Sequence, residues 1–220
     1  MISEAYNENC IDVMRRYPKE YFDLAIVDPP YGINRLEMSW TAQSNSNNGK
    51  SQADSSKWAS YEIKKWDNER PSAEYWAELK RVSKNQIVWG ANYFCEFLPS
   101  SMGWLFWDKG QDLSMSDGEL AYTSFNKALR RFKINRGQLM LEGGTIHPTQ
   151  KPILLYNKCF DFAKIEKGQR VFDSHLGSGS SAIAAHYFGV DFVGTELDKD
   201  YFDAAKARFD MATKQLAMSI

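Results

Sequence analysis

Apolar side chains follow two different rhythms along this chain, and the rhythms alternate. Short apolar runs bounded by Gly, Pro, Asp or Ser are typical of buried strands. Between them, apolar residues recur every three or four positions, which is typical of amphipathic helices. The alternation predicts an α/β fold built of layers of helices and strands. The expected strands are residues 22–27, 86–89, 104–107, 119–125, 170–173 and 192–196.

The helical stretches carry recognisable start and stop signals. Ser72 and Asp198 stand where an N-cap is expected, and Pro152 occupies the first turn of its stretch. Gly189 follows the last periodic residue of another stretch and closes it. The expected helices are residues 72–82, 152–163, 180–188 and 198–209.

One segment departs from the globular pattern. Residues 41–60 are dominated by Ser, Asn, Gln, Gly and Lys, with almost no apolar side chains, so they cannot bury enough surface to order themselves. They are either a solvated surface loop or a loop that orders on a polyanion. We therefore expect one domain over residues 1–220, with a polar insert at about 41–60 and a short recognition region at about 126–146.

Composition narrows the class of protein. The chain has 220 residues, 43% hydrophobic and 25% charged, which suits one globular domain. A net charge of −1 argues against a protein coated in positive charge, but nucleic-acid binding needs only a local basic face. Three cysteines without C-x-x-C spacing and three scattered histidines favour neither a disulfide framework nor a metal site. Because no signal sequence or membrane span is visible, we expect a cytoplasmic protein and no membrane partner.

A glycine loop near the C-terminus is the first candidate for ligand binding. The run Asp173-Ser-His-Leu-Gly177-Ser-Gly179-Ser180 joins an expected strand to an expected helix, so its backbone N–H groups can meet a ligand closely. Glu196 ends the next strand, where it could accept hydrogen bonds from ribose hydroxyls. The spacing also fits the dinucleotide fingerprint of NAD enzymes, and a glycine turn without a ligand is a third reading. Asp173 favours a cationic cofactor over a pyrophosphate.

The second candidate is Asp28-Pro29-Pro30-Tyr31, directly after an apolar strand. The prolines stiffen the backbone and leave the Pro29 carbonyl as a fixed acceptor beside the Asp28 carboxylate. Tyr31 adds a flat face one residue later. Two acceptors and a ring suit an exocyclic amine on a planar base, although a proline turn with a capping Asp is the alternative.

Together these motifs resemble the amino-group DNA methyltransferases of the D-P-P-Y type. The order, with the catalytic motif before the cofactor loop, is similar to their circularly permuted β group. The segment His147-Pro-Thr-Gln-Lys-Pro152, with residues 86–94 and 104–109, resembles small phage and prophage members. The resemblance covers most of the chain. It implies a Rossmann-like fold with a mixed, mostly parallel seven-stranded sheet flanked by helices, S-adenosyl-L-methionine as cofactor, and a prokaryotic or phage-infected cell.

The resemblance also implies roles for individual residues. Asp28, Pro29, Pro30 and Tyr31 would hold and stack the target base. The family usually has Asp-Pro-Phe where this chain has Asp173-Ser174-His175, so His175 replaces an aromatic ring. The residues expected around the cofactor are Asn9, Cys10, Asp28, Thr149, Gln150, Lys151, Asp173, His175, Gly177, Ser178, Gly179, Ser180, Glu196 and Leu197.

The expected substrate is double-stranded DNA. A basic stretch without acids favours phosphate contact, although a solvated helix face or an edge strand would look the same. In the resembled family Asp at position 28 favours adenine N6 over cytosine N4, so N6-adenine methylation is the leading hypothesis. A homodimer and a partner restriction endonuclease on another chain stay open. The expected DNA-binding residues are Lys127, Arg130, Arg131, Lys133 and Arg136.

Overall fold

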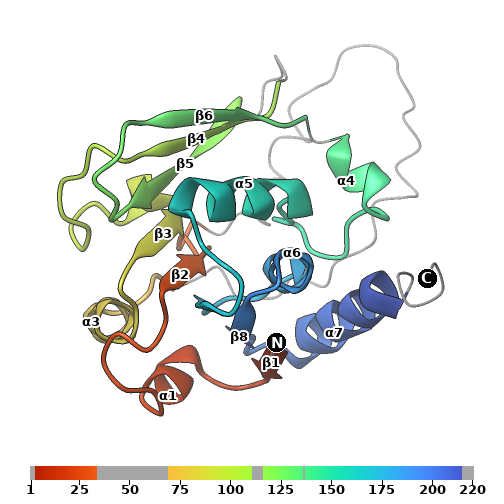
Figure 1. Ribbon diagram of the computed structural model, residues 1–220, viewed down its shortest axis with the longest axis horizontal. Coiled ribbons are helices and arrows are strands. Elements are labelled where there is room, and N and C mark those ends of the chain that lie inside the picture. Colours follow the sequence, from red (N-terminus) through yellow and green to blue (C-terminus); the bar gives the residue numbers. More distant parts are fainter. Residues whose placement is uncertain (1–2, 34–68, 111–115, 136, 215–220) are drawn as a thin grey trace. The chain divides into compact units, whose positions relative to one another are not determined.

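The computed structural model describes residues 3–33, 69–110, 116–135 and 137–214. The chain divides into two compact units, one formed by Met1–Pro29 with Pro71–Ile220 and the other by Pro30–Arg70. The expected insert at 41–60 and Arg136 lie outside the described residues. The first unit carries the sheet and its helices (Figure 1).

In the described part of the chain, eight strands form one sheet in the order β1-β8-β7-β2-β3-β5-β4-β6. Neighbours from β1 to β3 are parallel, β5 runs antiparallel to both β3 and β4, and β6 is parallel to β4. The sheet is therefore mixed and mostly parallel, as expected, with one strand more than the expected seven. The strands are β1 (Ser3–Tyr6), β2 (Leu24–Val27), β3 (Gln86–Trp89), β4 (Leu105–Asp108), β5 (Gly118–Thr123), β6 (Arg130–Lys133), β7 (Arg170–Asp173) and β8 (Asp191–Thr195).

The four expected helices begin within one residue of the starts that the sequence indicates, whereas α1 and α4 were not expected. Ser72 accepts a hydrogen bond from the Tyr75 amide at 3.3 Å, and Asp198 accepts from the amides of Asp200 and Tyr201 at 2.9 and 3.2 Å. The last helix runs five residues beyond its expected end at Phe209. The helices are α1 (Cys10–Met14), α3 (Ala73–Val82), α4 (Gln138–Leu141), α5 (Ile153–Ala163), α6 (Ser180–Phe188) and α7 (Lys199–Lys214), with a 3-10 turn η3 (Ala91–Tyr93).

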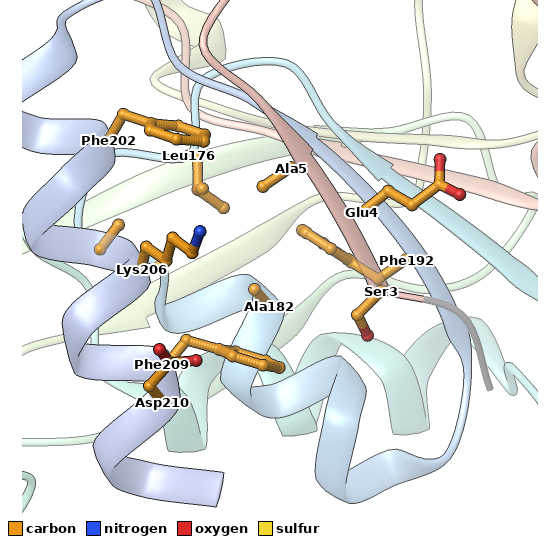
Figure 2. A pocket seen from close by; sticks show the side chains of 12 residues that line it. Ser3, Glu4, Ala5, Leu176, Ala182, Phe192, Phe202, Lys206, Phe209 and Asp210 are labelled. Atoms are coloured by element: carbon orange, nitrogen blue, oxygen red, sulfur yellow. The ribbon is translucent and has the colours of Figure 1, made fainter.

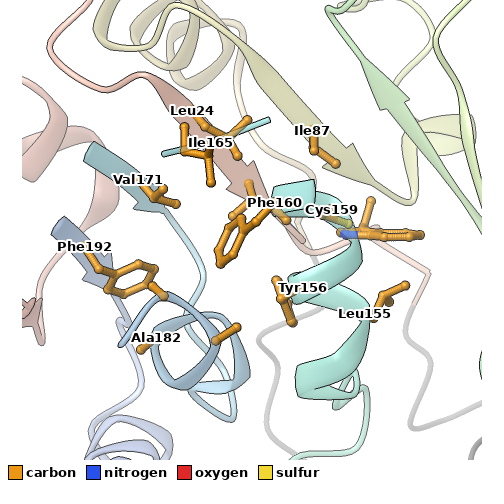
Figure 3. Packing of buried hydrophobic residues seen from close by; sticks show 14 of the residues in the cluster. Leu24, Ile87, Leu155, Tyr156, Cys159, Phe160, Ile165, Val171, Ala182 and Phe192 are labelled. Carbon is orange, nitrogen blue, oxygen red and sulfur yellow. The ribbon is translucent and has the colours of Figure 1, made fainter. Parts of the chain in front are cut away.

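The core has two layers because successive strand residues point to opposite faces of the sheet. On one face, α5 and α6 cover Leu24, Ile87 and Val171, with Phe160 inserted from α5 (Figure 3). On the other face, Phe22 stacks on Phe172 with ring centroids 4.9 Å apart, on the side where α1 and α3 lie (Figure 1). Burial on both faces explains why the central parallel strands read as continuous apolar runs.

This topology sets the position of the site. β2 and β7 are parallel neighbours, so Asp28, which follows β2, and Asp173, which ends β7, come to the same edge of the sheet. β8 is the parallel neighbour of β7 on its other side and brings Glu196 to that edge. The carboxyl ends of such strands are where open α/β sheets bind ligands.

Candidate active site

Asp173 is the most deeply buried acid of the glycine loop. Its side chain accepts hydrogen bonds from the Ser181 hydroxyl at 2.6 Å and from the His175 amide at 3.0 Å. Burial raises the pKa of this carboxyl to about 7, against the two hydrogen bonds, and the charges of Asp28 and Glu196 add to the increase. A cation bound beside Asp173 would favour its ionised form.

The loop itself is held open by glycines. Gly177 and Gly179 have φ values of 51° and 74°, in the left-handed region that suits glycine. At Gly179 a Cβ atom would lie 3.3 Å from the Ala205 backbone and side chain of α7. Arg208, also on α7, donates to the Ser178 carbonyl at 2.9 Å and to the Ser180 hydroxyl at 2.8 Å. These contacts fix the loop that Gly177, Ser178, Gly179 and Ser180 form.

Glu196 joins the loop to the turn after β8. Its carboxylate accepts from the Gly177 amide at 2.9 Å and from the Asp198 amide at 2.9 Å, so in this structure it braces the loop. Burial raises the pKa of Glu196, and the three amides facing it oppose that increase. The expected neighbour Leu197 is 70% exposed.

The turn after β1 lies beside the same edge. Asn7 donates to the carbonyls of Glu196 and Leu197 at 2.8 and 3.0 Å. Asn9 caps α1 by accepting from the Ile11 amide at 2.8 Å. Burial raises the pKa of the Cys10 thiol to about 11, and the charge of Glu196 contributes. The structure thus brings Asn9 and Cys10 together with the expected ribose acid.

The segment before α5 packs onto the loop through His147. Its ring lies 3.7 Å from where a Gly177 Cβ would stand and edge-on to Tyr201, with centroids 4.4 Å apart. Burial lowers the pKa of His147 to about 4, so the ring is neutral at physiological pH. Thr149 contacts the His147 Nδ1 atom, and Gln150 uses both ends of its amide on the Ile146 amide and the Gly144 carbonyl. Gln150 therefore shapes its own loop.

Lys151 lies elsewhere than the sequence suggested. Its ammonium forms a hydrogen-bonded ion pair with the Asp28 carboxylate and lies 3.1 Å from Glu119 Oε2. Glu119 is also paired, through its other oxygen, with Lys109 at 2.8 Å. Only 2% of the Lys151 side chain is exposed. The expected catalytic acid is therefore one member of a buried group of four charges.

The D-P-P-Y run crosses between the two units. Asp28 and Pro29 belong to the first unit, and Pro30 and Tyr31 belong to the second. His175 stands at the position of the family's aromatic residue. Its Nδ1 atom forms a hydrogen bond with the Ser174 hydroxyl at 2.8 Å, in which either atom can be the donor. That hydroxyl also contacts the Tyr75 hydroxyl at 2.7 Å, which ties α3 to the loop. Burial lowers the pKa of His175 to about 4.

The basic stretch forms an edge strand. Arg130, Arg131 and Lys133 lie on β6, which pairs only with β4 among the described residues, and all three are exposed. Lys127 differs, because its ammonium donates to the Phe162 carbonyl and lies over the Phe125 ring at 4.8 Å. The backbone of the basic stretch is therefore an edge strand, which was one of the alternatives that the sequence left open. It leaves three exposed cations on one border of the sheet, while Lys127 is anchored to α5.

A separate pocket of about 290 Å³ lies between β1, β8, α6 and α7. Figure 2 shows Leu176, Phe192, Phe202 and Phe209 directed into it. Gly179 is the one expected site residue among its lining. The pocket adjoins the loop through Gly179 and contains neither Asp28 nor Asp173.

Sequence reasoning missed the residues that reach the site from a distance. Glu119 and Lys109 were visible only as charges in or beside apolar strands, and Arg208 only as one basic residue of an amphipathic helix. Among the residues that the structure describes, no three His, Cys, Asp or Glu side chains gather as a metal site. No helix in those same ranges is long and apolar enough to cross a membrane.

Comparison with known proteins gives a consistent result. A family model described as DNA methylase, N6_N4_Mtase, matches residues 88–207, which is more than half of the chain. The Type II methyltransferase M2.DpnII of Streptococcus pneumoniae is 25% identical over 143 residues, 57% of this chain and 50% of that protein. M.HpaI of Haemophilus parainfluenzae is 34% identical over 64 residues, 29% of this chain and 20% of that protein. The matched segments thus span half, or less, of these curated relatives.

Solved structures share the fold. The M1.HpyAVI–SAM complex has a TM-score of 0.57 at 19% identity, covering 94% of this chain and 100% of that one. The PvuII cytosine-N4-specific DNA methyltransferase has a TM-score of 0.59 at 11% identity, covering 97% and 91%. At such identities the similarity is one of fold.

Proposed function

The chain belongs to the N6/N4 DNA methylase family, and from this membership we propose that it transfers a methyl group from S-adenosyl-L-methionine to adenine N6 in double-stranded DNA. The observation that carries the proposal is the pairing of β2 with β7. It sets Asp28 and the glycine loop side by side at the carboxyl edge of the sheet, although the loop lies far downstream in the chain. That order also supports membership of the permuted group.

The residues at this edge fit the cofactor. Asp173 offers a buried carboxylate whose proton a cationic ligand would displace, and Gly177 and Gly179 take the left-handed backbone conformation that turns the loop tightly between β7 and α6. Asp173, His175, Gly177 and Gly179 would hold the methionine part, and Glu196 with Asn9 and Cys10 the nucleoside part. When bound, S-adenosyl-L-methionine supplies an electrophilic methyl group.

Asp28 and Pro29 would bind the target. The base leaves the duplex, because an amine inside the stack cannot reach the loop. The Asp28 carboxylate and the Pro29 carbonyl accept the two amine hydrogens, which turns the nitrogen lone pair away from the ring and toward the methyl group. Pro30 stiffens the turn, and Tyr31 stacks on the base. Catalysis is then mainly orientation and electrostatic complementarity.

DNA contact is assigned to the exposed edge of the sheet. Arg130, Arg131 and Lys133 present positive charge along β6, and phosphates supply most of the sequence-independent affinity for DNA. Near them, Met140 and Leu141 of α4 are 76% and 82% exposed within the expected recognition region. Lys127 donates to the Phe162 carbonyl of α5, so it has a structural role whether or not it also contacts DNA.

The direct test measures transfer and product together. The purified protein is incubated with DNA and the cofactor carrying a tritiated methyl group, and the DNA is digested to nucleosides. N6-methyladenine supports the proposal, whereas N4-methylcytosine identifies the family's other amine as the target. No incorporation into DNA of varied sequence would contradict it. A nicotinamide absorbance assay on the same preparation tests the NAD reading of the glycine loop.

A further inference from the structure

Three charged side chains from three other segments form a chain of contacts that begins at Asp28. Lys151 precedes α5, Glu119 lies on β5, and Lys109 follows β4. Lys151 and Lys109 are 3% and 4% exposed as residues, among the least accessible charged residues of the described chain. The alternating order Asp28, Lys151, Glu119, Lys109 makes the group neutral.

The group departs from what fold stability alone would select. Burial of ion pairs is a weak source of stability, because desolvation offsets the attraction between the charges. Burial would lower the pKa of Lys151, but Asp28 and Glu119 outweigh it and raise that pKa. Burial would raise the pKa of Glu119, but Lys151 and Lys109 outweigh the effect of burial and lower this pKa to about 2. Lys151 and Glu119 therefore stay charged across the physiological pH range.

The surroundings of Asp28 would otherwise oppose its charge. Asp173 on β7 carries a second carboxyl, and the pKa of that carboxyl is raised by burial first and then by Asp28. Tyr75 on α3 and Tyr156 on α5 also interact electrostatically with Asp28. Burial is the main cause that raises the pKa of each phenol, and Asp173 and Asp28 add to the increase. Lys151 supplies a positive charge in direct contact with Asp28.

We propose that Lys151 is the positioning residue of Asp28, and that Glu119, itself held by Lys109, keeps Lys151 in place. The ammonium bridges two carboxylates, so it fixes the position of the Asp28 carboxylate before a base arrives. When the target amine takes its place on Asp28, Lys151 retains Glu119 as a partner and remains paired. This role rests on the proposed function, since Asp28 is assigned there to the target amine.

The two sides of the bridge make opposite predictions for the pH dependence of transfer. Lys151→Met removes a cation beside Asp28, so the acid limb of the rate profile should move to higher pH by about one unit, which is a tenfold loss of ionised carboxylate on that limb. Glu119→Gln removes an anion but leaves a side chain of the same shape whose amide oxygen can still accept from Lys151, so Lys151 stays beside Asp28 and the limb should move to lower pH. A merely structural role predicts no such pair of shifts.

The experiment compares both variants with wild type and with Lys84→Met. Lys84 pairs with Asp23 at 2.7 Å at the other end of β2, which makes it a matched lysine–aspartate control outside the site. For each protein, kcat and the cofactor KM are measured from about pH 4 to about pH 9, a range that reaches down to the ordinary carboxyl pKa. We expect Lys151→Met to lower kcat about tenfold on the acid limb with the cofactor KM nearly unchanged, and Lys151→Arg to restore part of it.

Three outcomes would overturn the proposal. They are unshifted acid limbs in both variants, shifts of the same sign, and a raised cofactor KM with kcat retained, which would make Lys151 a cofactor contact. If Lys151→Met does not fold, the Glu119→Gln shift decides alone.

A readout without turnover separates this proposal from the proposed function. Carbon-13 NMR follows the titration of the Asp28 carboxyl in the apo proteins, where Lys151→Met should move its midpoint upward and Glu119→Gln downward. If wild type transfers no methyl group, the proposed function fails, and these midpoints still decide the role of Lys151.

Discussion

Strand β2 has an aspartate–lysine pair at each end, and the two pairs differ in the exposure of the lysine and in its further partners. At its amino end Asp23 pairs with Lys84, whose side chain is 48% exposed, and also accepts from the Arg170 amide at 2.9 Å. At its carboxyl end Asp28 pairs with Lys151, whose side chain is 2% exposed.

The amino-end pair is a strand anchor. Burial would raise the pKa of Asp23, but Lys84 and the Arg170 amide outweigh the effect of burial and lower this pKa. Solvent screens such a pair, so it contributes little. The carboxyl-end pair is desolvated and linked to Glu119 and Lys109. The same two residue types thus contribute little where water reaches the lysine, and we propose that they serve the site where parallel strands end in a buried edge.

The largest effect is expected at Asp28. Asp28→Ala should reduce methyl transfer by about 10³-fold or more, because it removes the acceptor that orients the amine. Cofactor affinity, measured by calorimetry, should change only a few-fold. Asp28→Asn keeps one oxygen acceptor and the side-chain shape but loses the charge, so it separates the two effects, and Asp23→Asn provides the control at the other end of β2. Transfer retained in Asp28→Ala would contradict the assignment.

A second effect should appear at Asp173. Its carboxyl has a pKa of about 7 in the free protein, so a cationic cofactor binds best to the form that prevails above that pH. Affinity should therefore fall as pH drops below 7, approaching about tenfold per pH unit. Asp173→Asn should bind weakly and without this dependence. Calorimetry between pH 5.5 and 8.5 checks both, and a flat wild-type profile would count against a cationic ligand at Asp173.

The same carboxyl also affects stability, with a definite sign. The folded pKa is raised above the unfolded value of 3.8, so below that value the two states bind the proton equally. As pH rises from about 4 to 7 the unfolded chain releases this proton first, and the Asp173 contribution to folding becomes less favourable. Urea denaturation of wild type and Asp173→Asn across that window measures the difference, which should grow in favour of the variant.

A smaller effect is expected on the basic edge. Reversing Arg130 and Arg131 to glutamate should weaken DNA binding for all sequences and reduce the slope of log affinity against log salt by roughly two, one for each lost phosphate contact. Lys19→Glu, at an exposed lysine far along the chain from β6, is the control. If the variant binds DNA as tightly as wild type does at both low and high salt, DNA contact belongs to another surface.

The smallest effect should come from Lys84→Met, which removes the exposed pair at the amino end of β2. We expect a loss of less than about 1 kcal/mol in the free energy of unfolding, measured with denaturant, and unchanged methyl transfer. A clear loss of transfer would show that the two ends of β2 are coupled, and the contrast drawn between them would fail.

The sequence predicted those elements whose burial is local and regular. The strands at 86–89 and 170–173 and the helix at 180–188 were placed at their observed bounds, because apolar runs and glycine stops mark them directly. Two strands were missed for the opposite reason. β1 is short and mostly exposed, and β6 consists largely of basic residues, so both are strands because a neighbour pairs with them.

The same distinction applies to the site. Asp28, Asp173 and the glycines carry local signals, since each sits at a strand end or in a tight turn. The contact between Asp28 and Lys151 joins residues 123 positions apart, and nothing near Lys151 in the sequence indicates its partner. Glu119 and Lys109 appear as charges at strand positions, which is unusual enough to mark them but does not say what they face. Contacts of this kind follow from topology.

The pairing of β1 with β8 has a consequence for how the protein is made. Residues 3–6 hydrogen-bond to residues 192–195, and Asn7 reaches the Glu196 carbonyl across 189 positions. Chains emerge from the ribosome from the N-terminus at about 5–20 residues per second. The first strand must therefore wait for roughly ten seconds or more before its partner exists. During that interval its edge depends on chaperones or on its own charged residues to avoid pairing with other chains.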